Sequence, residues 1–261
     1  MRSLLVLAFW LAVWQLVAWA VGQEILLASP VSVTRRLTEL VGTAGFWGTV
    51  GHSLARIATG FLAAAVVGVL TAALAASSRV VDVVLAPAMT AVRAAPVVSF
   101  IILLLMLPGG SGRLAATTSF LMVLPIVHGT VLEGIRNRDR GLLEMAAVFR
   151  VPRLRRLAAI DIPAVLPYFA AACHVGIGLA WKAGVAAEVI GLPQGSIGER
   201  MYQGKLLLSS ADVLAWTVVV IAVSFASERL VALLLARGRA RLAGRPGGRP
   251  GAAADAQGVA V

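Results

Sequence analysis

Residues 142–169 read LLEMAAVFRVPRLRRLAAIDIPAVLPYF, a charged and proline-punctuated segment within a strongly apolar chain. At helical spacing its first half carries one apolar stripe, formed by Leu142, Met145, Val148 and Phe149. Val151 precedes a proline and is therefore biased out of the α region, whereas Pro152 suits the start of a new helix. The spacing predicts two short helices that meet at a corner, after which Pro163 and Pro167 lead into a long apolar run.

The composition of the chain indicates a membrane protein with several spans. Of its 261 residues, 59% are hydrophobic and 13% are charged, whereas soluble domains average about 45–50% and about 25%. The formal charge of +11 does not indicate nucleic-acid binding, because the basic residues lie in short loops and a tail without interleaved aromatic residues. The single cysteine, Cys173, excludes an internal disulfide framework.

About 20 apolar residues cross a bilayer as a helix, and on this basis the chain contains six predicted spans. They cover residues 3–21, 53–77, 83–107, 114–132, 163–190 and 212–235. We interpret the first as a retained span, because its apolar core is longer than the about 7–15 residues of a signal peptide. The third is interrupted by Arg93 and Pro96, so it is either a broken helix or an interfacial helix followed by a short span.

Basic residues in the loops predict the orientation of these spans. Fifteen fall on one side and five on the other, which places both termini and the loop at about residues 136–163 in the cytoplasm. Residues 1–242 are therefore expected to form one all-α transmembrane domain in the cytoplasmic membrane. The tail, residues 243–261, lacks apolar periodicity, so we expect it to be disordered, with its arginines at anionic lipid headgroups.

Two short motifs at fixed spacing resemble those of a known family. Glu144-Met145-Ala146 is followed, sixteen residues past the glutamate, by Ile160-Asp161-Ile162-Pro163. This pattern resembles the coupling loop in permease subunits of ATP-binding-cassette importers. Three further stretches are similar to the nitrate/sulfonate/taurine-type permeases: SPVSV (29–33), SLARIATGFLAAAVVG (53–68) and GIGLAWKAGVAAEVIG (176–191). The resemblance covers roughly residues 25–235 and implies a MetI-like permease fold with six transmembrane helices.

The resemblance implies that the loop is a coupling helix, which docks into a groove on a separate ATPase subunit. The candidate coupling residues are Glu144, Met145, Ala146, Arg150, Pro152, Arg153, Ile160 and Pro163. Two of them depart from the family pattern, since Met145 replaces an alanine and Arg150 stands where glycine is usual. Either Arg150 bears the about 1–2 kcal/mol of a left-handed residue, or the corner forms around Val151 and Pro152 instead.

The chain has no Walker A sequence, so we do not expect it to be an enzyme or to bind a cofactor itself. The resemblance implies that ATP and Mg²⁺ are used by two partner ATPase subunits. It also implies a second permease copy, expected to form a homodimer, and an extracytoplasmic solute-binding protein. Membrane lipid is a further expected partner, nucleic acid is not, and the three histidines are expected to be structural rather than metal ligands.

Two cations near the outer ends of predicted spans, Arg56 and Lys182, would suit an anionic solute such as a sulfonate, taurine or nitrate. The alternative is that both extend to the membrane interface. Pro96 and Trp181 are further candidates for the solute pathway. Trp181 is equally typical of a packing residue or an interfacial anchor.

Glu188 is the last pathway candidate, and it either pairs with Arg200 or another outer cation or contacts the binding protein. An ion-coupled secondary transporter is the alternative from another class, with Arg56, Lys182 and Glu188 as its ion path. Two observations disfavour it: Lys182 and Glu188 lie about 240° apart around a helix, and no acidic residue lies in the middle of a predicted span. A permease for an uncharged or heterocyclic solute, such as a thiamine precursor, is a second alternative.

Overall fold

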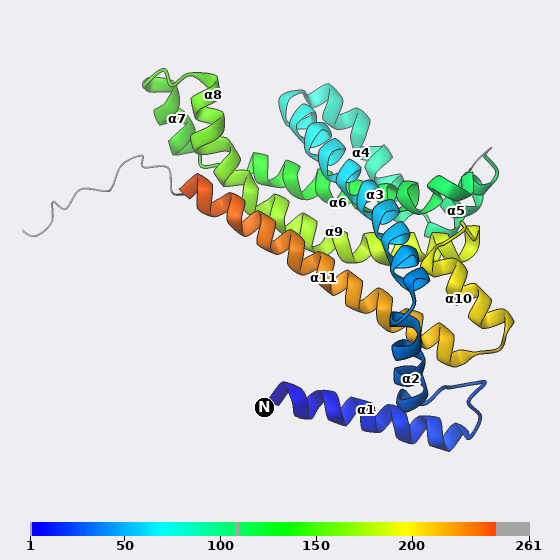
Figure 1. The fold of residues 1–261 in the computed structure, drawn as a ribbon. Helices are drawn as coiled ribbons and strands as arrows, with labels where there is room; N and C mark the ends of the chain where they lie inside the picture. Colours follow the sequence, from blue (N-terminus) through cyan, green and yellow to red (C-terminus); the bar gives the residue numbers. More distant parts are fainter. Residues whose placement is uncertain (1, 108–109, 244–261) are drawn as a thin grey trace, which may run out of the picture.

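The computed structural model describes residues 2–107 and 110–243, and in this part of the chain it contains helices and no strands (Figure 1). The elements are α1 (Arg2–Val21), α2 (Pro30–Val41), α3 (Ala44–Ser77), α4 (Arg79–Ala94), α5 (Val97–Leu105), α6 (Gly110–Arg136), α7 (Arg140–Val148), α8 (Arg153–Arg156), the π-helical turn η1 (Leu157–Asp161), α9 (Ile162–Gly191), α10 (Ile197–Leu206) and α11 (Ser210–Ala243). The predicted tail, residues 243–261, lies outside the described residues except for Ala243.

The helices confirm the all-α class and are compatible with six spans. Among the described residues, α3, α6, α9 and α11 are long and apolar enough to cross a bilayer, and the bent pair α4–α5 makes a fifth crossing if it is counted as one span. α1 (Arg2–Val21) coincides with the predicted first span. Two further helices, α2 and α10, are not among the predicted elements.

Helices α3, α6 and α9 form the core, because glycines allow them to approach one another closely. A Cβ added at Gly60 of α3 would overlap the carbonyl oxygen of Ala116 in α6. A Cβ added at Gly184 of α9 would lie 2.6 Å from Cγ1 of Ile57, which is fully buried in α3. α11 packs along α9, and α10 and α2 pack against α11.

The third predicted span is interrupted at Pro96, and the two helices that result fit both a broken helix and an interfacial helix followed by a short span. α4 and α5 meet at an angle of 96°, and Pro96 stands between them in an extended conformation. Ala95 precedes the proline and is extended as well, which ends α4. Arg93 lies in the last turn of α4 and donates from Nη2 to the carbonyl of Pro125 in α6 at 3.0 Å. The break therefore lies beside the middle of α6.

α1 lies apart from the other long helices and reaches them through α2 (Figure 1). Trp14 packs against a small cluster that includes Ala28 and Ala215. Most of the other apolar side chains that the structure describes in α1 are exposed, and Trp19 is 80% exposed. This helix therefore needs lipid or another protein chain around most of its surface.

Replacing Gly60 by alanine tests whether glycine sets the distance between α3 and α6. The new methyl group overlaps backbone, so we expect a loss of about 1–3 kcal/mol from overpacking and a lower melting temperature in detergent. Gly51→Ala is the matched control on the same helix, because a Cβ there meets nothing within 4 Å. Equal melting temperatures for the two variants would contradict this account of the core.

Candidate functional site

The segment predicted to form two short helices does so, and we call residues 138–161 the corner element. Asp139 begins α7, because its side chain accepts hydrogen bonds from the backbone N–H groups of Gly141 (2.8 Å) and Leu142 (3.3 Å). Pro152 precedes α8 in a conformation that separates the two helices. In Figure 1, α7 and α8 project from one end of the bundle.

Arg150 adopts the left-handed conformation that closes α7, with a φ of +46°. The N–H of Val151 donates to the carbonyl of Ala146 at 2.9 Å, and the N–H of Arg150 donates to the carbonyl of Ala147 at 3.1 Å. These two bonds form a Schellman motif, in which glycine is the usual residue at the position of Arg150. Of the two alternatives for the corner, the structure therefore confirms that Arg150 bears the cost of about 1–2 kcal/mol.

A buried carboxylate at the root of the corner element ties its two ends together. Asp161, the last residue of η1, is 6% exposed. It accepts a hydrogen bond from Nη1 of Arg138, which precedes α7, and another from Nε of Arg156, the last residue of α8, at 3.2 Å. Asp161 thereby fixes α7 and α8 relative to α9.

The outer surface of the corner element is apolar and open. Val148, Phe149 and Leu154 are 78%, 75% and 82% exposed. A water-facing surface rarely exposes large apolar side chains in a group unless it binds another molecule. Most of the predicted coupling residues are also exposed, namely Glu144, Met145, Arg150, Pro152, Arg153 and Pro163, whereas Ala146 is buried and Ile160 is half-buried.

A cavity of about 710 Å³ lies at the root of the corner element, between α3, α6 and α9. Its lining is mostly apolar, with Val131 and Phe169 among the residues that form it. Arg138, Arg156 and Asp161 line it as well. A shift of the corner element relative to α9 would therefore change the shape of this cavity.

At the opposite end of α9, a second buried carboxylate joins three helices. Glu188 is fully buried, and its Oε2 accepts hydrogen bonds from Ser53 of α3 at 2.7 Å and from the N–H of Gly198 in α10 at 3.3 Å. Arg56 is the cation beside it, with Nη1 3.9 Å from Oε1 of Glu188, so the pairing with Arg200 is not the one that forms. Arg56 and Glu188, two of the pathway candidates, are thus engaged with each other.

The remaining pathway candidates differ in exposure. Trp181 is buried and donates from Nε1 to the hydroxyl of Ser227 in α11 at 3.2 Å, which is a packing role. Its neighbour Lys182 is exposed on a cavity between α9 and α11. Pro96 is exposed at the break between α4 and α5. Lys182 and Pro96 are therefore the candidates that face open space.

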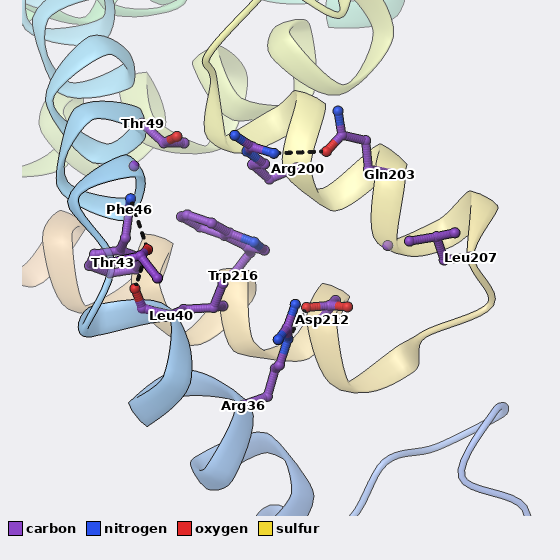
Figure 2. Close-up of a pocket in the computed structure, with 12 residues that line it drawn as sticks. Arg36, Leu40, Thr43, Phe46, Thr49, Arg200, Gln203, Leu207, Asp212 and Trp216 are labelled. Carbon is purple, nitrogen blue, oxygen red and sulfur yellow. Dashed lines mark hydrogen bonds and ion pairs between the residues drawn. The ribbon is translucent and has the colours of Figure 1, made fainter.

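A pocket of about 230 Å³ lies where α2, α3, α10 and α11 meet. Figure 2 shows Trp216 between Arg200 of α10 and Arg36 of α2. Arg36 donates to Asp212 at 2.5 Å and to Glu39 at 3.0 Å, and these hydrogen bonds raise the pKa of Arg36 above its usual value. Because its charges are largely paired, this pocket serves to join α2 and α10 to α11.

Sequence reasoning missed Asp161 as an anchor, although the residue stands within the quoted motif. A carboxylate at the start of an apolar span is costly unless it is paired, and this cost was the available signal. The arginine partners of Asp161 could not be identified from the sequence by this signal. Spacing alone does not select Arg138 and Arg156 from the seven arginines between Arg136 and Arg156.

Residues 64–239, from within α3 to within α11, match the family described as "Binding-protein-dependent transport system inner membrane component". The nitrate import permease protein NrtB of Synechocystis sp. is 30% identical over 199 residues, which cover 72% of this chain and 71% of that protein. The bicarbonate transport system permease protein CmpB of Synechococcus elongatus is 28% identical over 190 residues, 72% and 68% of the two chains. The aliphatic sulfonates transport permease protein SsuC of Bacillus subtilis is 26% identical over 235 residues, 90% and 85% of the two chains.

Replacing Arg150 by glycine should stabilise the corner element. Glycine adopts a left-handed conformation freely, and after its greater freedom in the unfolded chain is subtracted, we expect a net gain of about 0.5–1 kcal/mol. The measurement is slower hydrogen exchange of the α7 amides. Arg155→Gly is the control within α8, where the same change should have the opposite sign. Faster exchange in both variants would show that Arg150 is not strained.

Replacing Asp161 by asparagine should loosen the corner element and leave the spans intact. The change weakens two charged hydrogen bonds worth about 1.5–3 kcal/mol each, so trypsin should cleave at the arginines of the corner element about tenfold faster or more. Asp82→Asn is the control, because it removes only the 2.7 Å ion pair with Arg136. Unchanged cleavage in the Asp161 variant would mean that α7 and α8 are held by other contacts.

Proposed function

The chain belongs to the family of binding-protein-dependent transport system inner membrane components and is a permease subunit of an ATP-binding-cassette importer, and we propose that its solute is a small anion. The relatives are named for nitrate, bicarbonate and aliphatic sulfonates. These solutes share a negative charge, and a permease for them needs a cation within reach of its pathway. Lys182 supports the proposal, because it is exposed on a cavity between α9 and α11.

The proposed mechanism rests on two features of the corner element. The element exposes an apolar surface for a partner, and Asp161 connects that surface to α9. To switch the ratio of a gate's two conformational states from 1:99 to 99:1, about 5.5 kcal/mol of differential binding free energy is needed. A rigid element can transmit this free energy to the spans, whereas a mobile loop would not. The residues proposed to contact the ATPase are Glu144, Met145, Arg150, Pro152, Arg153, Ile160 and Pro163, together with Val148, Phe149 and Leu154, whereas Ala146 is buried and packs inside the corner element.

The proposed complex contains two copies of this chain and two ATPase subunits, which bind ATP and Mg²⁺. A solute-binding protein docks on the opposite face of the membrane. The excess of basic residues around the corner element supports a cytoplasmic location for it and for both termini. Arg56 is a weaker solute contact than Lys182 in this scheme, because Glu188 lies beside it.

Reconstitution in liposomes tests the function. The chain would be co-expressed with candidate ATPase and solute-binding subunits from the same genome, and uptake of nitrate, bicarbonate and ethanesulfonate would be measured. We expect uptake of at least one of these anions that requires ATP and the ATPase subunit. Uptake by the permease alone would refute the proposed mechanism, and ATP-driven uptake of uncharged solutes only would refute the proposed solute class.

Phe149→Glu in the same liposomes tests the corner element. A charge on this exposed apolar residue should abolish ATP-driven uptake and weaken co-purification of the ATPase, with the melting temperature unchanged. Val31→Glu is the control, since Val31 is equally exposed on α2, away from the corner element. Normal uptake by the Phe149 variant would show that the ATPase docks on a different surface.

A further inference from the structure

The cavity of about 710 Å³ at the root of the corner element combines a mostly apolar lining with a net positive charge. Of the charged side chains that line it, two are arginines, Arg138 and Arg156, and one is a carboxylate, Asp161. We propose that this cavity binds an anionic phospholipid of the adjacent membrane leaflet: the phosphate lies between the two arginines, and an acyl chain follows the apolar wall. The proposal goes beyond the proposed function, because it does not depend on which solute is transported.

The two guanidinium groups converge, because both donate to the same carboxylate. Arg138 donates from Nη1 to Asp161 and from Nε to the carbonyl of Ile135 at 2.7 Å, and Arg156 donates from Nε to Asp161 at 3.2 Å. Over residues 2–107 and 110–243, Nη2 of Arg138 and both Nη atoms of Arg156 make no hydrogen bond. Such donors suit the oxygens of a phosphate, which accept charge-assisted hydrogen bonds from arginine. Asp161 neutralises only one of the two arginines, so a positive charge remains for an anion.

The apolar wall of the cavity extends from the ends of three helices into their membrane-crossing parts. Val69 lies eight residues before the end of α3, and Phe169 lies seven residues after the start of α9. These separations correspond to about 12 Å and about 11 Å along the helices. The two arginines lie at the same helix ends, where α6 has just ended and α9 begins. Since α3, α6 and α9 are each long and apolar enough to cross a bilayer, the cavity reaches from the headgroup level into the acyl-chain region.

The described part of the chain leaves much of this wall uncovered. Ala73, Leu157 and Ile162 line the cavity and are exposed, and Phe169 is half-buried. An apolar wall offers no partner to a small anion, whereas an acyl chain packs against it without losing contact with the bilayer. The combination of arginines at one end and an apolar wall beyond them therefore favours a phospholipid over a free anion.

The charge around the cavity selects an anionic headgroup. Residues 136–156 contain seven arginines and two acidic residues, Asp139 and Glu144, so this end of the bundle attracts anionic lipids. Arg138 precedes α7 and Arg156 ends α8, so a phosphate bound to both contacts the corner element on either side of its two helices. The bound lipid would thereby help Asp161 to hold the corner element against α9.

Native mass spectrometry of the purified chain, released from nanodiscs that contain equal amounts of phosphatidylglycerol and phosphatidylcholine, tests the proposal. We expect the chain to retain phosphatidylglycerol in about fivefold excess over phosphatidylcholine, as one unneutralised arginine predicts. Arg156→Gln leaves one arginine and one carboxylate in the cavity, so this variant should retain the two lipids equally. Arg155→Gln is the matched control, because Arg155 is exposed on α8 and lies outside the cavity lining, and it should keep the original excess.

Ala73→Trp provides a second variant in case Arg156→Gln disturbs the corner element, because it fills the cavity from an exposed position on α3 and leaves both arginines in place. It should abolish retention of phosphatidylglycerol, whereas Leu74→Trp, on the same helix but outside the cavity lining, should not. Equal retention of the two lipids by the unaltered chain, or unchanged retention in the Ala73 variant, would overturn the inference. Displacement of the lipid by inorganic phosphate would also overturn it, because the arginines would then bind a free anion. None of these results would affect the uptake of solute in the liposome experiment, which tests the proposed function separately.

Discussion

A carboxylate that is buried in a membrane helix is costly unless a cation or a hydrogen-bond donor pairs with it, and α9 has one paired carboxylate near each of its ends. Asp161 accepts hydrogen bonds from Arg138 and Arg156 just before the helix, and Glu188 accepts one from Ser53 near the other end. One carboxylate holds the corner element, and the other holds α3 and α10. Because α9 is continuous between them, no loop separates the corner element from the helices at the far end of α9.

The rest of the architecture follows from how closely the helices approach α9. Glycines bring α3 and α6 into contact with it, so these three helices form a unit with little internal freedom. α11 is held by the bond between Trp181 and Ser227, and this contact also shapes the cavity that is lined by Lys182 and Glu228. By contrast, the break between α4 and α5 and the loosely attached α1 lie outside this unit. The corner element and the proposed solute contact, Lys182, are thus both attached to α9.

The sequence was sufficient for the long apolar helices, the corner between two short helices, and the break at Pro96, because each follows from local periodicity or from proline sterics. It did not give α2 and α10, which are short and amphipathic or polar, so hydropathy does not detect them. Contacts between helices that are distant in the sequence could not be predicted from it either. The pairing of Arg56 with Glu188, and the position of Glu228 beside Gly178, depend on which helices become neighbours.

The π-helical turn η1 has a consequence for how such a protein can change over evolution. A π-helical turn accommodates one residue more than an α-helical turn, so five residues there turn through about the same angle as four residues of an α-helix. Deletion of a single residue there would restore α-helical geometry and leave α8 in nearly the same direction around the axis of α9. One residue can therefore be gained or lost at the root of the corner element, while α7, α8 and every membrane-crossing segment keep their orientation.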